Sequence, residues 1–176
     1  MASFVQRMIG AARLSVPVYE EVEHDSSATG QAMAVVVLSS IAAGIAVWHG
    51  VPRAFLGGVI GDLIAWVIWA ILTWLIGTKI LPEGQTVADV PQLLRTLGFA
   101  SAPGILRFLG VIPFAGPVFL LLISIWMLIA MIIAVRQALD YSSTVRAIGV
   151  SVIGWIIYLV IYLVLFRPIA MTPILM

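Results

Sequence analysis

The stretch FLGVIPFAGPVFLLLISIWMLIAMIIAV, from Phe108 to Val135, decides the fold of this chain. It contains 28 residues and no charged side chain. An apolar run of this length is typical of a membrane-spanning helix with its entry loop. Pro113, Gly116 and Pro117 mark its start, where proline is well tolerated. The sequence becomes polar again at Arg136, so the expected solvent around this helix is a lipid bilayer.

The composition of the whole chain agrees with a membrane protein. Of the 176 residues, 62% are hydrophobic and only 10% are charged, whereas a soluble domain has about 25% charged residues. The mean hydropathy is +1.17. The formal net charge of +1 gives no basic excess for binding nucleic acid. The absence of cysteine removes disulfides, thiolate chemistry and cysteine metal ligands.

Five apolar segments predict an all-α fold, a polytopic membrane helical bundle with five transmembrane helices. We assign residues 29–167 to this five-helix membrane domain and 168–176 to a short tail. Residues 1–28 form an N-terminal interfacial helix and an acidic cytoplasmic lead. The expected membrane helices cover residues 31–48, 54–78, 91–113, 117–138 and 145–166.

The N-terminal lead has two parts. Residues 1–15 predict a short amphipathic helix, which we expect to lie on the bilayer surface, with a frayed terminus as the alternative. Its apolar side would hold Phe4, Val5, Met8, Ile9 and Ala12. Residues 19–25, YEEVEHD, form the most acidic patch of the chain. This patch is either a solvated linker or a surface that docks basic groups of a partner or of neighbouring loops.

The third segment, over residues 91–113, is unusual for a membrane helix. Pro103 removes a backbone hydrogen bond and is followed by Gly104, so we expect the helix to kink or break there. A broken helix at membrane depth is tolerated where it is buried in protein or lines a cavity. The sequence therefore places this segment inside the bundle.

Charged side chains within membrane helices are costly, so they should find partners. Asp62 and Arg107 are predicted to lie at similar depth, and to pair or to share a polar pocket. Arg95 and Arg136 are predicted at the opposite, inner side. Their candidate partners there are Asp89, Asp140, Glu20, Glu21 and Glu23.

Asp62 has two possible roles. Gly58, Asp62, Trp66 and Trp69 share one face of the second predicted helix, so an indole could donate a hydrogen bond to the carboxylate. The functional interpretation is an ion or substrate path through Asp62. The structural alternative is a buried salt bridge that fixes helix packing, or an arginine that extends to the interface.

Five spans place the two chain ends on opposite sides of the membrane. With a cytoplasmic N-terminus, six basic residues lie at the cytoplasmic side and three lie at the other side, as the positive-inside rule favours. The six are Arg7, Arg13, Lys79, Arg95, Arg136 and Arg146, and the three are Arg53, Arg107 and Arg167.

Catalytic and metal-binding patterns are absent from the sequence. No HExxH, GxSxG or Walker pattern occurs, and the two histidines, His24 and His49, lie in separate polar segments. We therefore predict no catalytic residue, no cofactor-binding residue, no metal ligand and no enzymatic activity.

Several short motifs resemble the Yip-domain family, named for Ypt-interacting proteins. They lie between Tyr19 and Phe166, and they are residues 19–25, 29–32, 98–104, 112–114, 116, 126, 135–141 and 144–147. The resemblance implies five membrane helices with a cytoplasmic N-terminus and, for bacterial members, the inner membrane. Eukaryotic members are tied to Rab GTPases and vesicle trafficking, but the acidic lead here is too short to imply a GTPase site. No activity or catalytic residue carries over.

These observations favour a non-enzymatic membrane scaffold or accessory subunit. Such a protein would bind the bilayer and other membrane proteins through small-residue faces and the acidic lead, within a larger energy-converting or photosynthetic complex. The alternative is a small transporter or channel-like protein that uses Asp62 and the broken third helix.

Overall fold

The computed structural model describes residues 2–46 and 52–166, which form helices and loops without a strand. This confirms the all-α prediction for the described chain. The elements are α1 (Phe4–Ala12), α2 (Val16–His24), α3 (Ala28–Ala46), α4 (Pro52–Leu75), the π-helix η1 (Ile76–Ile80), α5 (Val90–Ala100), the 3-10 helix η2 (Ala102–Val111), α6 (Gly116–Ala138) and α7 (Thr144–Phe166). His49, Arg167 and the predicted tail over 168–176 lie outside the described residues.

Within the described residues, three helical stretches are long and apolar enough to cross a membrane. They are Ala28–Ala46, Phe55–Ile80 and Gly116–Ala138. A shorter apolar stretch, Thr144–Val160, lies in α7. The third predicted helix is two short elements, α5 and η2, rather than one long helix. The structure thus supports a helical membrane protein with three helices capable of spanning, and the five-span arrangement stays a prediction.

The N-terminal lead is folded onto the bundle. Ser3 caps α1 in a capping box with Gln6, and α1 packs against α2, α5 and η2. The Trp126 indole of α6 donates to the Ala12 carbonyl at the end of α1 over 2.8 Å. In α2, Tyr19 and Val22 are fully buried. The interpretation of residues 19–25 as a solvated linker is therefore wrong.

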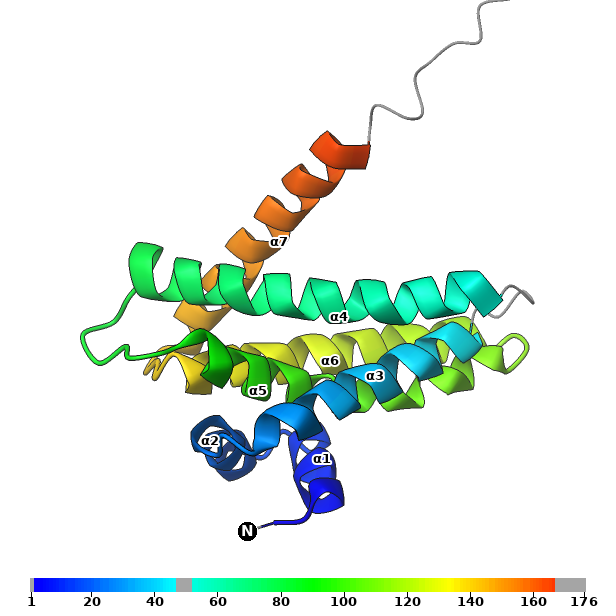
Figure 1. The fold of residues 1–176 in the computed structure, drawn as a ribbon, viewed down its shortest axis with the longest axis horizontal. Coiled ribbons are helices and arrows are strands. Elements are labelled where there is room, and N and C mark those ends of the chain that lie inside the picture. Colours follow the sequence, from blue (N-terminus) through cyan, green and yellow to red (C-terminus); the bar gives the residue numbers. More distant parts are fainter. Residues whose placement is uncertain (1, 47–51, 167–176) are drawn as a thin grey trace, which may run out of the picture.

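The break in the third predicted helix lies where the sequence places it. α5 ends at Ala100, and the chain continues from Ala102 as a 3-10 helix. Pro103 and Gly104 are buried inside the bundle as predicted, whereas Phe108 and Val111 farther along the segment are 42% and 55% exposed. Figure 1 shows α5 and α3 crossing at the centre of the molecule, where α3 contacts both α5 and η2.

Close contacts at this crossing depend on glycine. A Cβ atom at Gly98 would lie 2.7 Å from the Cβ of Ala32 on α3. A Cβ at Gly104 would overlap the Ser39 hydroxyl. Small residues let helix backbones approach closely in membranes, so these two positions fix the distance between α3 and the broken helix.

Helix α7 diverges from the bundle along its length (Figure 1). Its first half packs, with Ala147, Val150 and Ser151 buried. Farther along, Trp155 and Ile156 are 60% and 57% exposed.

Candidate functional site

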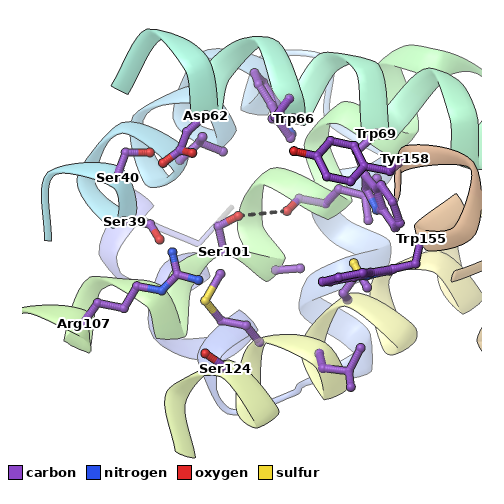
Figure 2. A pocket seen from close by; sticks show the side chains of 17 residues that line it. Ser39, Ser40, Asp62, Trp66, Trp69, Ser101, Arg107, Ser124, Trp155 and Tyr158 are labelled. Atoms are coloured by element: carbon purple, nitrogen blue, oxygen red, sulfur yellow. Dashed lines mark hydrogen bonds between the residues drawn. The ribbon is translucent and has the colours of Figure 1, made fainter. Parts of the chain in front are cut away.

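A cavity of about 450 Å³ lies among α3, α4, α5, η2, α6 and α7 (Figure 2). Its polar wall contains one acidic residue, one basic residue and four serines. These are Asp62, Arg107, Ser39, Ser40, Ser101 and Ser124. Asp62 and Arg107, which the sequence predicts to pair or to share a polar pocket, both line this cavity.

The two charged groups share the cavity without pairing. Among the described residues, neither Asp62 nor Arg107 takes part in a salt bridge or a side-chain hydrogen bond. Figure 2 shows the Asp62 carboxylate pointing toward Ser40 and the Arg107 guanidinium extending toward Ser39. The Trp66 indole donates to the Leu94 carbonyl over 3.1 Å, so it does not serve Asp62 as the sequence allowed. Both charges are available to a ligand.

The other wall of the cavity is apolar and aromatic. Trp66 and Trp69 come from α4, while Trp155 and Tyr158 come from α7 (Figure 2). The Trp69 indole N–H is buried and has no acceptor among the described residues. The cavity therefore combines a polar wall with both charges and an aromatic wall with a free donor.

Sequence reasoning missed part of this lining. It identified Trp66 and Trp69 from their spacing to Asp62, but not Trp155 and Tyr158 of α7. It also missed the serines, although each lies within an otherwise apolar segment, which was the available signal. Their convergence depends on how four separate helices pack.

Arg95 lies away from the cavity and ties α5 to α2. It is 7% exposed, and its Nε atom donates to the carbonyls of Val22 and Glu23 at 3.0 Å each. These carbonyls lie at the C-terminal end of α2, where a helix lacks intrahelical donors and carries partial negative charge. Glu23 is therefore a partner of Arg95 as predicted, but Arg95 binds its backbone carbonyl and not its carboxylate.

Arg136 caps the loop that follows α6. It donates to the carbonyls of Tyr141 and Ser142 over 3.2 and 3.3 Å. The predicted carboxylate partners are therefore wrong for Arg136. Nearby, the Arg146–Glu83 salt bridge of 3.3 Å and the Ser142 contacts to Glu83 join the loop after α6 to the loop after η1.

Arg7 forms an ion cluster that the sequence did not predict. Its side chain is 2% exposed and makes salt bridges of 2.9 Å with Glu21 and 2.6 Å with Asp25. It also donates to Gln31 over 3.3 Å. The Ser27 hydroxyl and the Arg7 guanidinium lower the pKa of Asp25 to about 2. As a docking surface, the acidic patch was expected to bind basic groups of a partner or of the chain itself. In the structure it binds Arg7 of the same chain.

Glu23 is the buried acid of the same region. It is 3% exposed, and burial together with the negative charge of Asp140 raises its pKa to about 7. The cluster around Glu23 also contains His24, Glu20 and Arg95. It lies outside the cavity and the membrane-spanning helices.

The described residues contain no group of three histidine, cysteine or acidic side chains that could hold a metal ion. Comparison with protein-family models, curated proteins and solved structures finds no match. Fold and site together define a class: an α-helical membrane protein with a polar and aromatic cavity inside its helix bundle.

Proposed function

We propose that this chain is a non-enzymatic scaffold or accessory subunit that binds other membrane proteins in a bacterial inner membrane. The proposal includes membership of the Yip-domain family, which the sequence motifs resemble. It also includes a place within a larger energy-converting or photosynthetic complex. The observation that carries the proposal is an uncovered glycine face on α4.

Gly57, Gly58 and Gly61 form this face. All three are exposed, and a Cβ atom on any of them would have no atom of the described chain within 4 Å. Gly57 and Gly61 have the GxxxG spacing that favours close helix association in membranes. Gly98 and Gly104, by contrast, are already used for packing inside the bundle. The α4 face is thus the small-residue surface that supports a partner helix.

The acidic lead contributes less to partner binding than the sequence indicates. Glu21 and Asp25 already pair with Arg7 of the same chain. We therefore assign the partner surface to α4 rather than to the lead.

The topology proposed for this function has five spans and a cytoplasmic N-terminus. α5 has 11 residues and η2 has 10, so in series they extend over about 36 Å. This length matches a hydrocarbon core of about 30 Å. α7 supplies the fifth span, and the positive-inside count sets the orientation.

Purification in mild detergent tests the scaffold proposal. The parent chain and the Gly30→Leu control should co-migrate with the same membrane partner, because Gly30 also has no neighbour within 4 Å but lies on α3. Gly61→Leu should lose that partner while keeping its own thermal stability. A parent chain that migrates as a monomer, or a Gly61→Leu variant that keeps the partner, would contradict the proposal.

The second candidate is a small transporter or channel-like protein. It is favoured by one observation, the cavity that brings Asp62 and Arg107 together beside the broken helix. Flux through proteoliposomes should then fall at least tenfold in Asp62→Asn, and the Asp89→Asn control outside the cavity should behave like the parent. Equal flux in Asp62→Asn and the parent removes this candidate.

A further inference from the structure

The cavity presents a positive and a negative group that the protein leaves uncompensated. Asp62 lies on α4 and Arg107 on η2, and both line the same space. Neither has a salt-bridge partner in the described chain. Charges at membrane depth are costly unless they are paired, so the arrangement calls for a ligand that supplies both missing counter-charges. A zwitterion has this property, whereas an anion or a cation would satisfy one group alone.

The aromatic wall indicates that the ligand also has an apolar part. Trp66 lies next to Asp62 on α4, and Trp69, Trp155 and Tyr158 line the side away from the Ser40–Asp62 corner (Figure 2). The buried Trp69 indole N–H lacks an acceptor, and a buried donor left without one costs about 1–3 kcal/mol. A ligand oxygen near the aromatic wall would satisfy it.

The cavity opens sideways, toward the region that lipid would occupy. Leu128 of α6 and Trp155 and Tyr158 of α7 line the cavity and yet are 45%, 60% and 44% exposed. Trp155 and Tyr158 belong to α7, the helix that diverges from the bundle (Figure 1). A ligand can therefore keep its headgroup in the cavity while its hydrocarbon chains leave between apolar helices.

From these three observations we infer that the cavity binds the headgroup of an aminophospholipid such as phosphatidylethanolamine. The ammonium group donates to the Asp62 carboxylate, and the phosphate accepts from the Arg107 guanidinium. An ester carbonyl accepts from the Trp69 indole, and the serines supply further hydroxyl groups. The inference goes beyond the proposed scaffold role, since the α4 glycine face is not part of the cavity lining.

The experiment measures lipid retention by the full-length protein in detergent, using native mass spectrometry. Phosphatidylethanolamine should be retained about tenfold more tightly than phosphatidylglycerol, which lacks the ammonium group. Asp62→Asn should abolish this preference, and Arg107→Gln should weaken both lipids about tenfold. Trp69→Phe should weaken both lipids without changing the preference. Asp89→Asn and Arg13→Gln, the matched controls outside the cavity, should match the parent.

A second readout keeps the proposal testable if a variant folds poorly. The chain has no cysteine, so Ser101→Cys places one thiol in the cavity wall. Phosphatidylethanolamine should slow its alkylation by a maleimide, and adding Arg107→Gln should remove that protection. Equal retention of both lipids by the parent would overturn the inference. So would displacement of the lipid by free phosphoethanolamine at equal concentration, which would assign the site to a soluble headgroup.

Discussion

At the scale of single residues, Glu23 makes the pH response of this protein predictable. Its pKa is raised from 4.5 to about 7 by burial and by Asp140. Between these values the folded chain holds a proton that the unfolded chain has released, so the free energy of unfolding falls as pH rises through this window. Glu23→Gln should flatten this slope and be more stable than the parent at pH 8, by on the order of 2 kcal/mol.

Thermal unfolding in detergent between pH 5 and 8 measures this effect. His24 is the necessary control, because the Glu20 carbonyl and the charge of Glu23 raise its pKa above 6.5. Its contribution to stability is fully present below pH 6.5 and is lost as pH rises through that higher pKa. His24→Gln should therefore be less stable than the parent below about pH 6.5 and should match it at higher pH. Asp25, whose pKa is lowered to about 2, acts only in strong acid. A slope that survives in Glu23→Gln would show that Glu23 is not its source.

The residue scale is also where sequence reasoning reached its limit. Asp62 and Arg107 could be placed at similar depth, because each lies toward the predicted outer end of its helix. Arg7 could not be recognised as buried, because its partners Glu21 and Asp25 reach it only after α2 folds back across α1. Arg95 and Arg136 found carbonyl groups instead of carboxylates. Helix ends leave such acceptors unsatisfied, and their positions depend on tertiary packing.

At the scale of elements, the contact between α3 and α5 depends on Gly98. A larger side chain would press against Ala32, whose backbone carbonyl carbon and oxygen lie 3.1 Å from the position of a Cβ. Gly98→Leu should therefore destabilise the protein by about 1–3 kcal/mol, because overpacking forces the two helices apart. Gly30→Leu on α3 meets no neighbour within 4 Å and should leave the unfolding temperature nearly unchanged. Equal stability of the two variants would mean that α3 and α5 are not closely packed.

The features of an element that depend on its own residues could be predicted from the sequence, whereas those that depend on distant segments could not. The break near Pro103 was predictable, since proline acts on its own helix. The 3-10 geometry of Ala102–Val111 was not, because such a run is long for this helix type and depends on packing against α3. The π-helix Ile76–Ile80 was likewise missed. The Tyr141 hydroxyl donates to the Gly77 carbonyl over 3.0 Å and to the Leu81 carbonyl over 2.7 Å. These hydrogen bonds join segments that are distant in the sequence, so local patterns do not indicate them.

At the scale of the whole molecule, charge is distributed unevenly between the two ends of the bundle. Seven of the eight acidic residues lie in α2, at its C-cap Asp25, and in the two loops after η1 and α6, and the remaining one is Asp62. These segments interlock through contacts such as Gln85 to the Asp140 carbonyl and Gln137 to Glu20. One end of the molecule is thus a polar layer. The loop over 112–115 at the other end is apolar, with Phe114 fully exposed.

Cysteine labelling tests the orientation that follows from this asymmetry. The chain has no cysteine, so Val87→Cys and Phe114→Cys each give a single thiol. Both side chains are exposed, at 76% and 100%, in loops at opposite ends of the bundle (Figure 1). In intact bacterial cells an impermeant maleimide should label Phe114→Cys, and it should label Val87→Cys only after lysis, because the polar layer with most basic residues favours the cytoplasm. The reverse pattern would invert the orientation but keep the crossing helices. Labelling of both thiols before lysis would mean that α5 and η2, which lie between these loops, do not together cross the membrane, and it would contradict the five-span topology.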